Sequence, residues 1–267
     1  MIRKTIVSGQ FYPSKKEDLD TLIKKLSPEK VQSRCRAKGV IVPHAGYPFS
    51  GKVAAAAISK ITAPKNIVML GVNHRDLGKK FSLSEAESWQ TPYREVKVNH
   101  FLGEKILDSG SFIQKDSFAH KAEHSLEVEL PILQYFFKDF QIIPISCSLS
   151  DQETYKGVAN QIHQGIKDNS TDTLLLASTD LTHYEPDQTV RRKDRKVIEA
   201  ITELNPEKLI KQVEENNITM CGVAPVAVML FCLAGQFKKA EVILYQTSGD
   251  ATGDYSSVVG YAGIVVR

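Results

Sequence analysis

Cysteine is scarce in this sequence and long apolar runs are missing, and the two shortages exclude several classes of protein. Only four of the 267 residues are cysteine, and no two have the spacing Cys-x-x-Cys, so a disulfide scaffold is not expected. The most apolar helix candidate, Val223–Leu233, is too short to span a bilayer. The first residues also lack the apolar region of a signal peptide. We therefore expect a cytoplasmic protein that does not enter membranes and whose cysteines are structural or catalytic.

A strong excess of one charge is also missing, as are the common nucleotide and hydrolase motifs. The formal net charge is +3, which is too small to indicate binding to nucleic acid or to an anionic membrane. The chain contains no Walker A motif, no dinucleotide fingerprint and no Gly-x-Ser-x-Gly motif. No repeat or linker divides it, so we expect residues 1–267 to form a single domain.

Short apolar, β-branched segments alternate with amphipathic segments along the chain. This alternation is typical of an α/β protein whose mostly parallel or mixed sheet is covered by helices on both faces. Residues 83–98 instead predict short strands or a hairpin, with Trp89 as a packing anchor. The predicted strands are 39–42, 66–72, 141–147, 173–178, 241–245 and 258–266. The predicted helices are 14–26, 53–58 with Ser50 as its N-cap, 122–137, 154–167, 191–202, 206–216 and 223–233.

Polar side chains arrive where several of these strands end. His44 follows the first predicted strand and His74 follows the second, while Asp180 and His183 follow the fourth. Cys221 lies just before the last predicted helix. Because the carboxyl ends of parallel strands share one edge of a sheet, we expect these side chains to meet in one pocket there.

The other histidines are less clearly placed by the pattern. His124 lies at the start of a predicted helix, and Glu127 is three residues further on and on the same side of that helix. This pair is a further candidate for the pocket. His100 and His120 have polar neighbours in the sequence and are predicted to lie at the surface.

The chemistry of this set favours a metal ion over a catalytic triad. Two neutral imidazoles and one thiolate suit zinc, copper or iron. The start of a helix before residue 223 would favour the thiolate of Cys221. Asp180 is close enough in sequence to fix the tautomer of His183, which would leave one ring nitrogen to transfer a proton. The alternatives are structural: a loop histidine that ties its turn, a cysteine that acts as a small buried hydrophobe, and an Asp180–His183 pair that only holds its loop.

Seven short motifs resemble the Memo family, which is met in prokaryotes as component B of the AmmeMemoRadiSam system. They occur in order and extend over nearly the whole chain. They are Gly9-Gln10-Phe11-Tyr12-Pro13, Val42-Pro43-His44-Ala45-Gly46-Tyr47, Leu70-Gly71-Val72-Asn73-His74, Glu123-His124-Ser125-Leu126-Glu127, Ser178-Thr179-Asp180-Leu181-Thr182-His183-Tyr184, Cys221-Gly222 and Gly260-Tyr261-Ala262-Gly263.

This resemblance implies a single three-layer α/β/α domain like that of class III extradiol non-haem iron dioxygenases. It also implies that His44, His74 and Cys221 coordinate a metal ion. Cys221 stands where the dioxygenases have a carboxylate, and a thiolate is softer and more easily oxidised. The implied metal is copper or iron, with zinc as a further candidate. The remaining implied pocket residues are Asp180 and His183 as catalytic groups, with His124, Glu127 and Tyr47 nearby.

Three functions follow as hypotheses from these residues. The first is metal-dependent redox or oxygen-linked chemistry, in which His183 acts as acid or base. The second is zinc-assisted hydrolysis with the same ligands. The third is binding of a small molecule or peptide without turnover, suggested by the Memo resemblance to a phosphopeptide-binding adaptor.

Overall fold

The central sheet is mixed, with a parallel middle. The structure is a computed structural model that describes residues 1–29, 33–235, 237 and 239–267. These residues form a nine-stranded sheet in the order β10-β12-β2-β9-β3-β8-β4-β7, with β11 on the other side of β12. The strands are β2 (Gly39–Val42), β3 (Asn66–Val72), β4 (Phe81–Leu83), β7 (Gln114–Lys115), β8 (Gln141–Cys147), β9 (Thr173–Ser178), β10 (His183–Glu185), β11 (Ala240–Thr247) and β12 (Val258–Val266).

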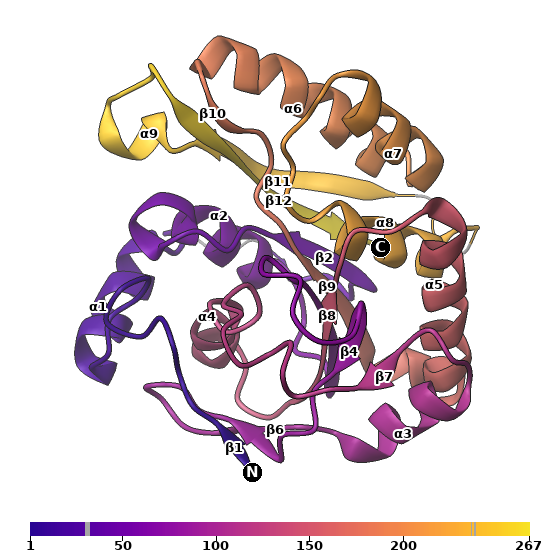
Figure 1. The fold of residues 1–267 in the computed structure, drawn as a ribbon. Helices are drawn as coiled ribbons and strands as arrows, with labels where there is room; N and C mark the ends of the chain where they lie inside the picture. The colour runs from indigo at the N-terminus through magenta and orange to yellow at the C-terminus, as the bar shows by residue number, and fades with distance from the viewer. Residues whose placement is uncertain (30–32, 236, 238) are drawn as a thin grey trace.

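Helices cover both faces of this sheet, as the alternation in the sequence predicted (Figure 1). Side chains alternate across each strand, so Val40 and Val42 pack on one face and Ile41 on the other. The first face is covered by α1 (Lys16–Leu26), α2 (Tyr47–Ser59) and α4 (Glu129–Phe136). The second is covered by α3 (His100–Asp108), α5 (Gln152–Ile166), α6 (Asp187–Thr202), α7 (Pro206–Glu215) and α8 (Val223–Leu233). The α/β/α architecture is therefore confirmed.

Smaller elements complete the fold. The segment predicted to form a hairpin contains β5 (Ser88–Trp89) and β6 (Val96–Lys97), which pair antiparallel, and β1 (Ile2–Arg3) adds beside β5. A 3₁₀ helix occupies Lys167–Asp172, and α9 is Gly249–Thr252. Among the described residues, no helix is long and apolar enough to cross a membrane.

The parallel strands β2, β9, β3 and β8 end at the same edge of the sheet. His44 lies two residues beyond β2, His74 two beyond β3 and Asp180 two beyond β9. The loops that follow these strands therefore bring the predicted side chains together, as the strand pattern indicated.

The predicted N-cap of α2 and the predicted exposure of His120 are both wrong. Helix α2 begins at Tyr47 with Gly46 as its N-cap, and the Ser50 hydroxyl lies inside the helix and donates to the Ala45 carbonyl. Pro48 explains the earlier start, because its fixed φ suits the first helical turn. His120 is buried instead of exposed, with Nε2 2.8 Å from the Ser82 carbonyl oxygen.

Glu127 and Tyr47, predicted to line the pocket, are instead buried structural residues. The Glu127 carboxylate accepts hydrogen bonds from Arg3 Nη1 at 2.7 Å and from the Tyr12 hydroxyl at 2.8 Å. It also accepts from the backbone N–H groups of Ile6 and Val7. Glu127 thus ties the N-terminal segment to the domain. The Tyr47 hydroxyl donates to the Val128 carbonyl at 2.7 Å.

We predict that Glu127→Ala destabilises the protein by about 3–5 kcal/mol, because it leaves Arg3 and several N–H groups without their buried acceptor. The measurement is the free energy of unfolding in urea. Glu215→Ala is the control, since Glu215 forms an exposed pair with Lys211 and such pairs contribute about 0–1 kcal/mol. Equal effects of the two variants would contradict the role of Glu127.

Candidate metal centre

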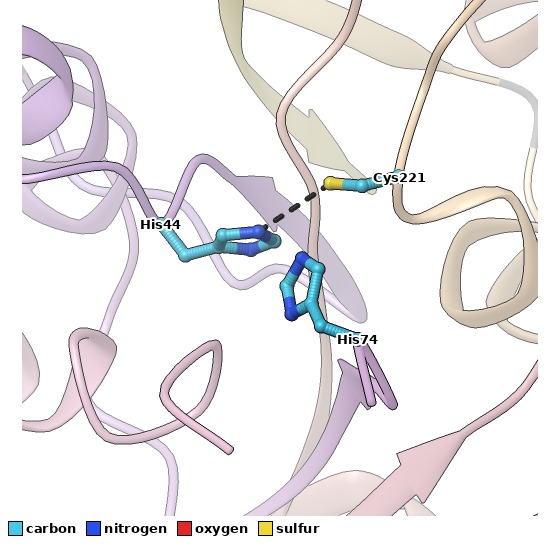
Figure 2. Close-up of side chains that lie close together, drawn as sticks. All are labelled: His44, His74 and Cys221. Carbon is cyan, nitrogen blue, oxygen red and sulfur yellow. Dashed lines mark hydrogen bonds between the residues drawn. The ribbon is translucent and has the colours of Figure 1, made fainter. Parts of the chain in front are cut away.

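Three potential ligand atoms meet at the carboxyl edge of the sheet. His44, His74 and Cys221 each offer one such atom, and these atoms all lie within 4.8 Å of one another. Figure 2 shows both imidazole rings and the Cys221 sulfur turned toward a common point. The Cys221 sulfur lies 3.4 Å from His44 Nε2. The predicted group of three is therefore present in the structure.

The position of Cys221 depends on the glycine that follows it. Gly222 is the N-cap of α8, and its N–H donates to Thr179 Oγ1 at 3.0 Å. A Cβ atom at residue 222 would lie 2.3 Å from the Thr179 Cβ, so only glycine lets α8 start so close to the end of β9. The Asp180 N–H then donates to the Cys221 sulfur at 3.3 Å.

Glu123, which the sequence reasoning missed, fixes His74. Its carboxylate lies 3.0 Å from His74 Nδ1 and accepts the His74 N–H at 2.9 Å. It also accepts the N–H groups of His124 and Ser125, both at 2.8 Å. Burial opposes ionisation of Glu123, but the hydrogen bonds and charge of His74 outweigh it and lower the pKa of the carboxyl to about 2. An ionised partner on Nδ1 directs Nε2 of His74 toward the other two ligands.

His124 forms a wall of the site. Its ring stacks on His74 with a centroid distance of 4.8 Å and meets the His44 ring edge-on at 5.5 Å. Burial lowers the pKa of His124, so its ring is neutral at pH 7. His74, Glu123 and His124 also form a group with metal-ligand geometry. Because Glu123 already accepts several N–H groups, it acts as a support for His74 in this structure.

His44 is buried and neutral. Burial, followed by the nearby His74 and His124, lowers the pKa of His44 well below its usual value. The backbone N–H of His44 donates to Asp180 Oδ1 at 2.9 Å, and the ring nitrogen Nδ1 lies 2.8 Å from Ser178 Oγ. A neutral imidazole is the form that binds a metal ion.

The predicted pairing of Asp180 with His183 is not found among the hydrogen bonds of the described residues. Asp180 accepts the N–H of His44, and burial raises the pKa of its carboxyl to about 6. His183 Nδ1 lies 2.8 Å from the Thr219 carbonyl, which can only accept, so that carbonyl fixes the tautomer of the ring. Residues 183–185 form strand β10, so closeness in sequence does not bring the Asp180 carboxylate onto the His183 ring.

The expected thiolate at Cys221 also needs correction. Burial, and then the charge of Asp180, raises the pKa of the Cys221 thiol. The start of α8 does not reverse this effect. A bound cation would, because its charge favours the deprotonated thiol.

The residues fit one transition-metal ion. Ligands bound at about 2.0–2.3 Å to the same ion lie roughly 3–4 Å apart, slightly closer than the observed limit of 4.8 Å. Two imidazoles and a thiol are soft to intermediate donors. The side chain of His74 keeps 30% of its surface exposed, which leaves one side of the group open.

The fold and the site define a class of α/β/α proteins with a His/His/Cys group at the carboxyl edge of the sheet. The family model for Memo-like proteins matches residues 3–265. A MEMO1 family protein of Methanopyrus kandleri is 38% identical over 281 residues, which cover 100% of this chain and 99% of that protein. Another MEMO1 family protein, from Aquifex aeolicus, is 39% identical over 267 residues, which cover 99% of this chain and 98% of that protein. The chain belongs to the Memo family.

A solved structure is similar in fold. It is the crystal structure of the uncharacterized protein JW3007 from Escherichia coli K12, with a TM-score of 0.60 and 12% sequence identity. The match covers 86% of this chain and 100% of that one. At this identity the likeness concerns the fold alone, and the relation to extradiol dioxygenases stays a prediction.

Asp194, in α6, holds the loop that carries Asp180 and His183. Its carboxylate accepts the Thr182 N–H at 3.0 Å and the Thr182 hydroxyl at 2.5 Å. It also accepts the Tyr245 hydroxyl at 2.8 Å. Burial raises the pKa of Asp194 to about 6, although the hydrogen bonds from Thr182 oppose this.

We predict a pH dependence of stability from Asp194. A raised pKa in the folded state means that the folded protein binds the proton more tightly, so this contribution to stability falls as the pH rises through about 6. Between pH 5 and 7.5 the loss should be on the order of 1 kcal/mol larger in the wild type than in Asp194→Asn. Urea unfolding of metal-free protein at both pH values measures it. Asp254→Asn keeps Asp194 and changes an exposed carboxylate with a lowered pKa, so it should lose as much stability between the two pH values as the wild type does.

Proposed function

We propose that this protein binds one transition-metal ion through His44, His74 and Cys221 and uses it for redox or oxygen-linked chemistry. The observation that supports the proposal is the convergence of three ligand atoms from three separate segments within 4.8 Å. Copper and iron suit this chemistry, and the thiol favours copper over a metal that prefers oxygen ligands. When bound, such an ion supplies a centre for electron transfer or for polarising a ligand.

The protein's own groups have distinct tasks in this proposal. Glu123 orients His74, and burial keeps His44 neutral, as a ligand must be. His183 holds its Nδ1 proton against the Thr219 carbonyl, so its Nε2 is the nitrogen that accepts or donates a proton. Zinc-assisted hydrolysis uses the same ligands, and the identity of the bound metal separates it from redox chemistry.

A second candidate function is ligand binding without turnover. Tyr184, next to His183, is 77% exposed and has a φ of +58°, a conformation that costs a bulky residue free energy. Strained residues of this kind cluster at active sites and ligand clamps, and this observation favours recognition of a small molecule or peptide beside the site. Ligand binding that survives removal of the metal would support this function.

We predict that protein purified without a chelating tag contains about one equivalent of metal. His44→Ala, His74→Ala and Cys221→Ser should each lose it, because each removes one of the three ligands that this group of described residues offers. Elemental analysis measures the content. Cys35→Ser is the matched control, since Cys35 lies outside the group, and it should keep its metal. Full metal content in all three ligand variants would contradict the proposal.

We predict that His183→Ala keeps its metal but loses activity. The residue is assigned to proton transfer, and general acid–base groups contribute about 10²–10⁴-fold to the rate. Elemental analysis and oxygen uptake in the presence of a reductant measure the two properties. If His183→Ala loses its metal as fully as His44→Ala, His183 is a ligand instead.

A further inference from the structure

A buried set of hydrogen bonds supports His44 on the side away from Cys221. His44 Nδ1 lies 2.8 Å from Ser178 Oγ. The same oxygen lies 2.9 Å from the carbonyl oxygen of Ser125 and 2.8 Å from Oε1 of Glu129. Ser178 and Glu129 are 0% and 1% exposed, so water does not replace these contacts.

The three contacts of Ser178 determine where the protons lie. A hydroxyl group carries one hydrogen and can accept two hydrogen bonds. The Ser125 carbonyl can only accept, so it receives the Ser178 hydrogen. His44 Nδ1 and Glu129 Oε1 must then both donate to Ser178 Oγ. Any other arrangement leaves two acceptors facing each other in a buried place, which is unfavourable.

The surroundings of Glu129 agree with this arrangement. Burial raises the pKa of the Glu129 carboxyl well above its usual value, and the charge of Asp180 raises it further, although the bond to Ser178 opposes this. This direction favours the protonated carboxyl, which has the hydrogen that the three contacts of Ser178 require. The contact of His44 with Cys221 agrees with this proton arrangement too. A ring with its proton on Nδ1 presents a lone pair on Nε2 to the Cys221 sulfur.

We propose that Ser178 and a protonated Glu129 are positioning residues that hold His44 as its Nδ1–H tautomer, with the Nε2 lone pair directed at the metal position. The link to a metal rests on the function proposed above, but the tautomer is a property of the metal-free protein. His74 is supported by the ionised Glu123, whereas His44 is supported by neutral groups. The two imidazoles are therefore ligands of unequal basicity.

The tautomer is measured directly in metal-free protein. Protein labelled with ¹⁵N-histidine gives a two-bond ¹H–¹⁵N correlation pattern that distinguishes the two tautomers, and His44→Asn identifies the signal of His44. We expect the Nδ1–H form in the wild type and a rise of the Nε2–H form in Ser178→Ala. Ser146→Ala is the matched control, because this buried serine on β8 lies near the Val72 carbonyl and not near His44. An Nε2–H form in the wild type would overturn the inference without any variant.

The proton on Glu129 has its own signature. The infrared difference between wild type and Glu129→Gln at pH 7 should contain the carbonyl stretch of a protonated acid. Glu129→Gln should also keep the Nδ1–H tautomer, because its amide group can donate to Ser178 as the protonated acid does. A difference spectrum with only carboxylate bands would mean that Glu129 is ionised and cannot donate to Ser178, and it would overturn the proposal.

A metal titration separates this inference from the proposed function. With zinc as the probe and a competing chelator, we expect Ser178→Ala to weaken binding by about 10–100-fold, as is usual when a partner of a ligating histidine is removed. Ser146→Ala should bind as the wild type does. If the wild type binds zinc but His44 is the Nε2–H form, this inference fails and the proposed function stands. If the wild type binds no metal but shows the Nδ1–H form, the proposed function fails and the tautomer assignment stands.

Discussion

The candidate site depends on the parallel pairing of β2 with β9 and of β9 with β3. In this register Val42 is opposite Ser178, and Leu70 is opposite Ala177, so the strands end at nearly the same level. The loops that follow them must then meet above one edge of the sheet. A shift of one residue in any of these pairings would turn its side chains to the opposite face and separate the group. The apolar packing on both faces opposes such a shift.

Buried polar contacts refine what the strands bring together. The Glu123 carboxylate accepts from four donor groups, two in the loop that contains it and two on His74, and this accounts for its ionised state in a buried place. Asp180 is tied to the backbone of His44, so the loops after β2 and β9 are joined directly. Such networks constrain geometry strongly, because each member loses a partner if the loops move. The orientation of the ligand side chains therefore depends on the hydrogen bonds between all the loops at this edge of the sheet.

The strand pattern was enough to predict which loops would meet, but not which polar atoms would pair. Asp180 and His183 were paired because of their spacing, whereas Asp180 bonds to His44, which is 136 residues away. Glu127 was placed beside His124 by assuming a helix over residues 122–137, but α4 begins only at Glu129. The Val128 N–H does bond to the His124 carbonyl at 3.1 Å, but the regular helix starts later, and the Glu123 carboxylate reaches His74. The predicted thiolate of Cys221 neglected burial, which outweighs the helix start.

The sequence by itself determined the alternation of strands and helices, the sheet edge at which polar residues gather, and the membership of His44, His74 and Cys221 in one group. The alternation and the sheet edge follow from local patterns of apolar residues and from the rule that parallel strands end together, whereas the group of three follows from the resemblance to the Memo family. Only the tertiary structure decided the partners of these side chains, because Glu123, Ser178 and Thr219 are brought to their histidines by contacts between distant segments. It also decided protonation, since the pKa of a buried group depends on desolvation and neighbours that no local pattern contains.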